Sequence, residues 1–172
     1  MDSPIDKIPE IIKIIIGSKE NKLCAEEIKK YYRDDVEYKH FLTYIQSSHN
    51  SRERLIALNK FNKGYLWSDC EIIHDIWFND DSLKAIIDVT QIAKRGIWFW
   101  FNYSTRLLIK LDLSYDTNGK YVIRKQEVFI HPEELAGAFV PFLVPKLILF
   151  WKWLFTWAIV AVGMFYGLVN WA

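Results

Sequence analysis

Cysteine and the common catalytic motifs are scarce in this sequence. Cys24 and Cys70 are the only two cysteines among 172 residues, and their separation fits no zinc or redox motif. A disulfide has no positive support, so two reduced thiols in a cytosolic domain are expected. Gly-rich phosphate loops and Ser-centred nucleophile elbows are absent. The histidines have no paired-ligand spacing, so neither a metal nor a cofactor is expected; they are His40, His49, His74 and His131.

Net charge is small as well. The 22 basic and 21 acidic side chains give a formal net charge of +1, which argues against a nucleic-acid binder with a broad basic surface. The charges are unevenly placed, because Lys146 and Lys152 are the only charged side chains after Glu134. A polar domain followed by an apolar tail is neither a purely soluble protein nor an all-membrane protein.

The tail predicts a membrane anchor. Trp153–Ala172 has no charged side chain, and as a helix it would be about 30 Å long, the thickness of a hydrocarbon core. Lys146 and Lys152 put positive charge on its N-terminal side, which is expected to face the cytosol. Aromatic side chains would mark both membrane interfaces: Trp151, Trp153 and Trp157 at one end, Tyr166 and Trp171 at the other.

A membrane hairpin is the alternative to a single span. Its arms would be Ala138–Trp151 and Trp153–Ala172, with a bend at a proline or at Gly163, and it would suit a lipid-droplet monolayer as well as a bilayer. No N-terminal signal peptide is visible, because Asp2 and Asp6 interrupt the basic region that such a peptide needs. We therefore expect a tail-anchored chain with a cytosolic N-terminal domain, at the endoplasmic reticulum or a lipid droplet.

Hydrophobic periodicity predicts helices first and strands afterwards. Isoleucines at helical spacing over residues 4–17 predict the first helix. Further helices are expected over Ala25–Arg33 and Asn50–Gly64, with an extended segment, Val36–Tyr44, between them. The period then changes to two, which predicts four strands: Cys70–Phe78, Leu83–Ile92, Arg106–Tyr115 and Lys120–Ile130.

This order of elements predicts an α+β fold in which helices pack on a curved antiparallel sheet. The curved sheet would leave a cavity on its concave face, and a C-terminal transmembrane or hairpin helix would follow it. The expected division is a folded domain over residues 1–134, a proline-containing linker over 135–146 and a membrane anchor over 147–172.

Several short strings occur together in the order of a known family. They are Tyr31-Tyr32 before Asp34-Asp35, Glu37-Tyr38-Lys39-His40-Phe41, Asn50-Ser51-Arg52, Val89-Thr90-Gln91 before Ile97-Trp98-Phe99-Trp100-Phe101, Arg106-Leu107, Gly119-Lys120-Tyr121, Gln126-Glu127 and Phe142-Leu143-Val144-Pro145. With these strings the chain resembles the fungal SigF-like branch of the nuclear transport factor 2-like superfamily, whose cone fold includes SnoaL-like cyclases and ketosteroid isomerase. The resemblance covers nearly the whole chain, although Leu42 stands where the family has proline. It implies a cone-shaped pocket and a membrane-attached domain, and it implies no reaction.

A site of the ketosteroid-isomerase type needs a carboxylate in an apolar cavity and an opposing hydrogen-bond donor. Glu127 and His40 are the candidates for this role. The alternatives are cross-strand ion pairs for Glu127 and a packed or surface position for His40. Asp88 is expected to be a solvated surface charge, because alternation places it on a polar strand face. The wider set considered also contains Asp35, His74 and Tyr103.

Four residues are candidates for ligand binding. Gln91 interrupts an apolar strand face, so its amide would bond to backbone groups at a strand end or to a ligand hydroxyl or carbonyl. The aromatic stretch over residues 97–103 has too many large rings for a solvated turn, and these would pack in the core, dip into the membrane interface, or both. The candidates are Gln91 as a polar anchor, and Trp98, Trp100 and Tyr103 as a gate near the membrane.

The predicted function is that of a membrane-anchored, cytosol-facing domain binding an apolar or amphipathic small molecule, of lipid or sterol-like class, in the cone. A membrane-bound isomerase, dehydratase or cyclase is the alternative, and a non-catalytic adaptor for another membrane protein is a third. The expected partners are a lipid bilayer or lipid-droplet monolayer and the small molecule, without nucleic acid. A homodimer is a further expectation.

Overall fold

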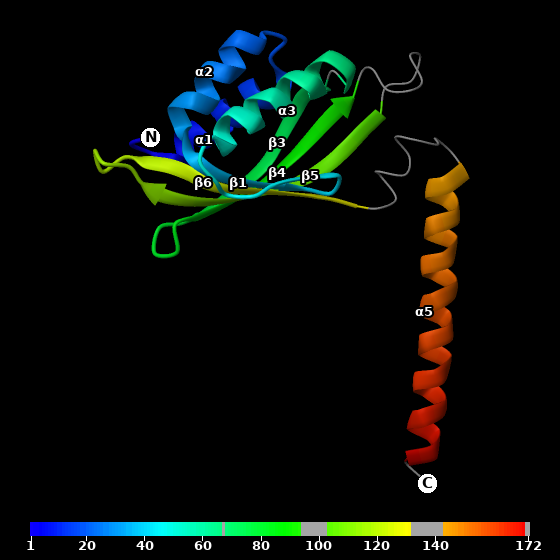
Figure 1. The fold of residues 1–172 in the computed structure, drawn as a ribbon. Helices are drawn as coiled ribbons and strands as arrows, with labels where there is room; N and C mark the ends of the chain where they lie inside the picture. Colours follow the sequence, from blue (N-terminus) through cyan, green and yellow to red (C-terminus); the bar gives the residue numbers. More distant parts are fainter. Residues whose placement is uncertain (67, 94–102, 132–142, 171–172) are drawn as a thin grey trace. The chain divides into compact units, whose positions relative to one another are not determined.

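The computed structural model describes residues 1–66, 68–93, 103–131 and 143–170, with side chains left undescribed at 64–72, 93, 103, 143, 145 and 165–170. The chain divides into two compact units, Met1–His131 and Pro132–Ala172. The first unit joins helices to a curved sheet, and the second contains one long helix (Figure 1). The predicted α+β cone fold is confirmed.

A six-stranded sheet forms the base of the first unit. Its strands follow the order β2-β1-β6-β5-β4-β3, and neighbours are antiparallel except for β1 and β6, which are parallel. The strands are β1 (Tyr32–His40), β2 (Thr43–Ile45), β3 (Ser68–Asn79), β4 (Lys84–Ala93), β5 (Tyr103–Tyr115) and β6 (Tyr121–Ile130). The four strands expected from the alternation are β3 to β6, and the expected extended segment forms the β1–β2 hairpin.

Helices cover one face of this sheet (Figure 1). They are α1 (Pro4–Gly17), α2 (Asn21–Tyr31) and α3 (Ser51–Leu66). α1 packs on β3, while α3 packs on β1 and on α2. α1 begins at Pro4 because the fixed φ of proline suits the first helical turn and its missing N–H is not needed there. Its buried residues, at helical spacing, include Ile8, Ile11, Ile12 and Ile15.

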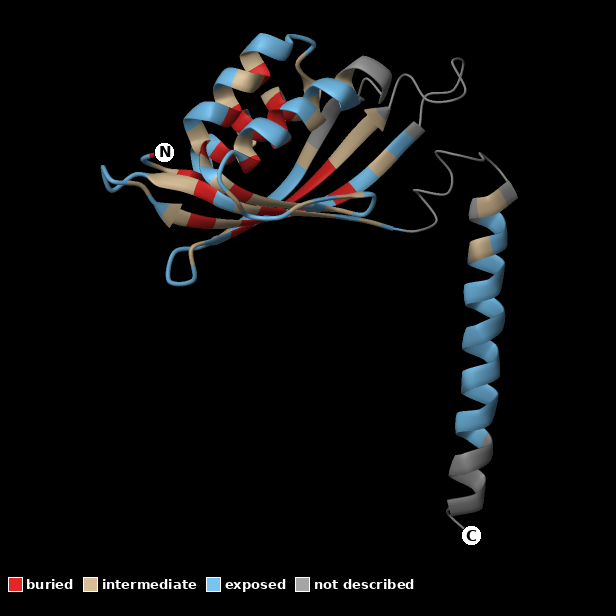
Figure 2. Cartoon of the chain, viewed as in Figure 1, coloured by how far each residue is buried: buried red, intermediate tan, exposed pale blue. Residues whose placement is uncertain are grey.

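Strand alternation gives the sheet an inner face toward the helices and an outer face. The buried inner face is apolar, with Ala85, Ile87, Val89, Leu107, Ile109, Leu111 and Ile123 among its residues. β6 breaks the alternation, because Leu113 pairs with Ile123 whereas the preceding residue, Asp112, pairs with Lys125. This bulge leaves Arg124 as an extra residue and turns Gln126 inward. Figure 2 shows the buried residues where helices and sheet meet.

One end of the sheet, which we call the wide end, is where β1, β4 and β6 finish and β5 begins. The register places the residues there: Ile130 is the partner of Leu107, and Ala93 is the partner of Tyr103. The chain leaves the first unit at this end, because β6 is the last strand. The aromatic stretch between Ala93 and Tyr103 connects two strand ends at the same place, although Trp98 and Trp100 themselves lie outside the described residues.

The second unit contains α5 (Leu143–Asn170), which is continuous over 28 residues and about 42 Å long at 1.5 Å per residue. Its segment Lys146–Met164 has a mean hydropathy of 1.8 and is 0% buried, so it is long and apolar enough to cross a membrane. The helix runs without interruption through Lys152 and Gly163, so the hairpin with arms on either side of Lys152 is wrong. Pro145 is tolerated because it lies in the first turn.

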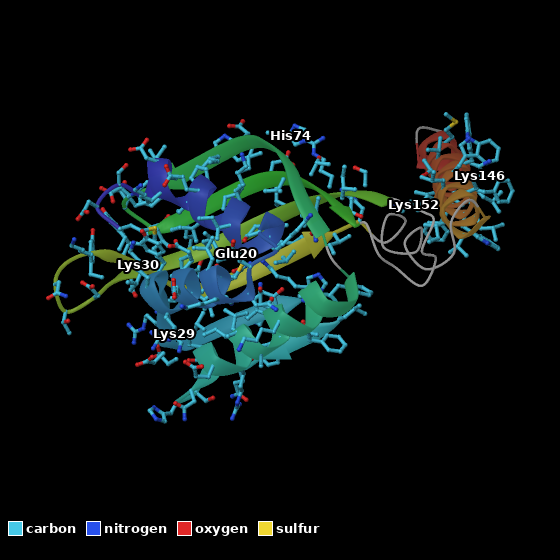
Figure 3. The ribbon with its side chains drawn as sticks, turned by 90° about the horizontal axis from the view of Figure 1, so that it is seen from above. Glu20, Lys29, Lys30, His74, Lys146 and Lys152 are labelled. Atoms are coloured by element: carbon cyan, nitrogen blue, oxygen red, sulfur yellow. The ribbon has the colours of Figure 1, made fainter. Side chains whose placement is uncertain are left out.

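The side chains expected at the membrane are exposed where they are described. Trp151, Trp153 and Trp157 have exposed fractions of 64%, 58% and 57%. Lys146 and Lys152, labelled in Figure 3, lie in the N-terminal half of α5. The side chain of Tyr166 and the whole of Trp171 lie outside the described residues.

Candidate functional site

Burial of the inner face changes along the sheet. At its centre Ile87 and Ile109 are 0% and 1% exposed. Along β6 toward the wide end, burial falls from Gln126, which is 7% exposed, to Val128 and Ile130, which are half-buried, as is Tyr38 of β1. The helices therefore cover the middle of the inner face fully and this part of the wide end only partly. An apolar surface of this kind can accept an apolar molecule.

Two buried polar groups on the inner face bond to each other. The Tyr32 hydroxyl donates a hydrogen bond of 2.7 Å to Oε1 of Gln126, and these residues are 2% and 7% exposed. Burial raises the pKa of Tyr32 well above its usual range, so the phenol stays protonated and acts as a donor. Tyr38 is the register partner of Gln126, and burial raises the pKa of Tyr38 to about 12.

His40 lies at the end of β1, on the same face as Tyr38. Their rings are stacked, with centroids 6.5 Å apart and planes at 5°. Burial lowers the pKa of His40, so its imidazole is neutral at neutral pH. The Leu42 backbone N–H donates to Nδ1 at 3.4 Å, which leaves the ring proton on Nε2. Among the described residues, no carboxylate is hydrogen-bonded to this ring.

Gln91 and His40 are not brought together. Gln91 lies on the inner side of β4, half-buried, and its register partners are Cys70 and Thr105. Three strand spacings separate β4 from β1, which is about 14 Å across the sheet. The two residues therefore stand on opposite sides of the inner face.

Glu127 lies on the outer face, away from the helices. Its carboxylate oxygens are 2.9 Å from Nζ of Lys125 and 3.2 Å from Nζ of Lys110, and Lys39 approaches to 3.8 Å. The hydrogen bonds from Lys125 and Lys110 lower the pKa of Glu127. The side chain thus forms the cross-strand ion pairs considered as its alternative, and it does not reach the inner face where a proton-transfer base would be needed.

Asp88 lies on the outer face as alternation predicts, but it is covered and not solvated. Its residue is 8% exposed, and Arg106 Nε bonds to its two oxygens at 2.9 and 3.1 Å. The hydrogen bonds from Arg106 lower the pKa of Asp88. The expectation of a solvated charge was wrong because a strand neighbour supplies a guanidinium fork that fits the carboxylate. Nearby, His74 Nε2 lies 2.8 Å from Thr90 Oγ1.

The remaining candidates are placed as follows. Asp35 pairs with Arg33, 2.8 Å away on the same strand, and so its charge is already partnered. Tyr103 is the first residue of β5, and its side chain lies outside the described residues, as do Trp98 and Trp100. Within the described part of the chain, no three His, Cys, Asp or Glu side chains cluster as metal ligands would.

Sequence reasoning missed the Tyr32–Gln126 pair. The signal was the adjacent pair of charged residues Arg124 and Lys125. In a regular strand two neighbouring residues point to opposite faces, so one of these charges would lie on the apolar face. A bulge at that point puts Gln126 on the apolar side, where an amide needs a partner. Its partner lies on a strand far away in the sequence, which alternation within one strand does not identify.

Replacing Tyr32 by Phe is expected to lower the free energy of unfolding by about 1–3 kcal/mol, because the buried Gln126 oxygen loses its donor. Urea unfolding of the detergent-solubilised chain measures this loss. Tyr115→Phe is the matched control, since the Tyr115 hydroxyl also donates, to Tyr121 at 3.2 Å, but at an exposed position. Equal losses of unfolding free energy in the two variants would show that the buried hydrogen bond stabilises the domain no more than the exposed one does.

The fold is also found in known proteins. Over residues 1–171 the sequence matches the SigF NTF2-like domain. The chain belongs to the SigF NTF2-like domain family. No curated protein sequence matches it. The matched residues include both the first unit and α5, so the family model describes the two units together.

Solved structures with the same fold lie at very low sequence identity. A phenazine biosynthesis-related protein from Pseudomonas aeruginosa has a TM-score of 0.56 at 11% identity, covering 82% of this SigF-like chain and 87% of its own. An NTF2-like protein from Anabaena variabilis has 0.55 at 8%, covering 74% and 86%. ActVI-ORFA from Streptomyces coelicolor has 0.52 at 11%, covering 73% and 93%. These likenesses show the fold alone.

Proposed function

We propose that this SigF-like protein is a membrane-anchored domain that holds an apolar or amphipathic small molecule, of lipid or sterol-like class, against its inner face at the wide end. NTF2-like and SnoaL-like proteins are often isomerases, cyclases or ligand binders. The carrying observation is the half-buried apolar surface of Val128, Ile130 and Tyr38, beside a fully buried core. Polar groups are few there, as expected of a site for an apolar ligand.

The anchor is the second part of the proposal. α5 leaves its apolar side chains exposed over a length that matches a bilayer. Lys146 and Lys152 near its N-terminal end favour a cytosolic domain. A ligand of lipid class would then enter from the membrane to which the domain is tethered. The aromatic residues Trp98 and Trp100, connected at the wide end, remain our candidates for the gate.

Filling the wide end tests the ligand site. Ile130→Trp would occupy inner-face space, whereas Phe129→Trp changes the adjacent residue, which is exposed on the outer face. Full-length chain in detergent is irradiated with a diazirine-bearing sterol or fatty acid, and the adducts are mapped by mass spectrometry. We expect adducts on β1 and β6 that Ile130→Trp abolishes and Phe129→Trp retains. Adducts confined to α5, or equally reduced in both variants, would contradict the proposal.

A proton-transfer enzyme is the second candidate function. It is favoured by His40, whose neutral imidazole lies toward the wide end of the inner face. The observation against it is that the described carboxylates considered for this role are on the outer face or already paired with cations. Binding therefore explains the arrangement with fewer assumptions than catalysis does.

A further inference from the structure

Exposed apolar side chains gather at the wide end, on the outer face of β5 and β6 and in the turn between β1 and β2. Leu108 and Phe129 are direct register partners on β5 and β6, so their side chains lie on the same face about 5 Å apart. Phe41 and Leu42 form the turn between β1 and β2. Phe41 is level with Phe129 along the strands, because Lys39 and Glu127, each two residues earlier, are register partners. Together with Leu42 these residues form what we call the strand-end patch, with exposed fractions of 62% (Phe41), 59% (Leu42), 40% (Leu108) and 52% (Phe129).

Charged side chains border the patch. On the side toward the middle of the sheet lies the row of ion pairs that joins Lys39, Glu127 and Lys110. Arg106, with a side chain 61% exposed, stands on β5 two residues from Leu108. The lysine and arginine side chains of these ion pairs, which include Arg106 with Asp88, border an apolar patch. This arrangement matches the interfacial layer of a membrane, where apolar groups enter the acyl boundary and lysine or arginine remains among the headgroups.

The connection between β6 and α5 is short in sequence. β6 ends at Ile130, one residue after Phe129, and α5 begins at Leu143. The 12 intervening residues span at most about 45 Å. The patch is thus attached by a short connection to the helix that we propose as the anchor. A tether of this length keeps the patch at high effective concentration near the bilayer surface, so weak insertion is sufficient for docking.

We propose that the strand-end patch docks on the surface of the bilayer that holds α5, which brings the wide end of the domain against the lipid. This inference rests on the proposed membrane anchoring and adds a defined orientation to it. In this orientation the half-buried inner face at the wide end lies beside the lipid, so an apolar ligand could pass between membrane and domain without crossing water. The other surfaces of the domain would remain in the aqueous phase.

Site-specific photo-crosslinking tests the orientation. A benzophenone side chain is introduced into the full-length chain at position 41 or 129, and the chain is reconstituted in phosphatidylcholine vesicles. Position 115 is the matched control, because Tyr115 is also an exposed aromatic (51%) but lies seven residues along β5 from Leu108, about 24 Å away. After irradiation, mass spectrometry identifies adducts to lipid. We expect lipid adducts from positions 41 and 129 and none from position 115.

The outcomes separate this inference from the anchor itself. Vesicle flotation is measured on the same samples. A chain that does not float with the vesicles contradicts the membrane anchor, and with it the basis of the docking. A chain that floats but gives no lipid adduct at positions 41 and 129, or gives equal adducts at 115, overturns the docking alone. Adducts to a second copy of the chain would assign the patch to a protein interface instead.

Discussion

Deletion of residues 143–172 is expected to release the chain from membranes completely and to leave Met1–His131 folded. Each apolar residue in a membrane helix contributes about 0.3–0.6 kcal/mol to insertion, and the segment Lys146–Met164 of α5 supplies such residues with 0% of the segment buried. The first unit keeps its own core, which includes Ile12, Ile87 and Leu111. The measurement is sedimentation after an alkaline carbonate wash, with circular dichroism of the released domain.

A pair of point variants distinguishes insertion from simple adhesion. Ile159→Lys puts a charge near the middle of the span, which costs about 2.5–3.5 kcal/mol, and should weaken carbonate-resistant attachment. Leu147→Lys adds the same charge beside Lys146, where the side chain reaches the interface, and should leave attachment nearly unchanged. If the truncated chain still sediments, or if the two lysine variants behave alike, α5 is not a membrane span.

Truncation of Ile12 to Ala is expected to lower the free energy of unfolding of the domain by about 2–5 kcal/mol. Ile12 is 0% exposed and lies on the face of α1 that packs over the sheet. Removing its methyl and methylene groups loses apolar burial and leaves a cavity, because a closely packed interior relaxes only in part. Urea unfolding followed by tryptophan fluorescence measures the difference from the parent chain.

Ile5→Ala provides the control within the same helix. Ile5 is 55% exposed, so the same chemical change should alter the free energy of unfolding by no more than about 0.5 kcal/mol. Both variants gain the helix propensity of alanine, which cancels from the comparison. A loss at Ile12 as small as that at Ile5 would mean that α1 does not hold the sheet face together.

The elements of this fold follow largely from local patterns. The isoleucine spacing predicted the first helix with the bounds that α1 has, because proline begins it and one face carries the apolar residues. Alternation in β4 and β5 likewise assigned Ile87 and Ile109 to the core. These predictions succeed because an element that buries one face needs apolar residues at a regular spacing, and this spacing is visible among neighbouring residues in the sequence.

Long-range pairing was harder to predict. The parallel contact between β1 and β6 joins Tyr38 to Gln126, and no local pattern indicates which strand lies beside which. The same limit applies to the site. Glu127 was a candidate because the irregular alternation of its strand left the face of its side chain open. The bulge at Arg124 places Glu127 on the outer face, and this bulge is seen only in the register with β5. Gln91 was assigned to the inner side, but its separation from His40 depends on strand order.

A SigF-like domain on a single apolar helix has little need for a large solvent-exposed opening if its ligand comes from the membrane. Three features lie together at the wide end: the end of the last strand, the strand-end patch and the half-buried part of the inner face. The ion pairs of Glu127 and Asp88 keep the adjoining outer face polar.

Native mass spectrometry of the full-length chain, released directly from lipid nanodiscs made with membrane lipid extract, tests the central claim most directly. We predict a population that carries one apolar molecule of defined mass, present on the Phe129→Trp variant and absent from the Ile130→Trp variant. A chain that carries no such molecule, or one whose bound lipids are the same mixture in both variants, would contradict a ligand site on the inner face.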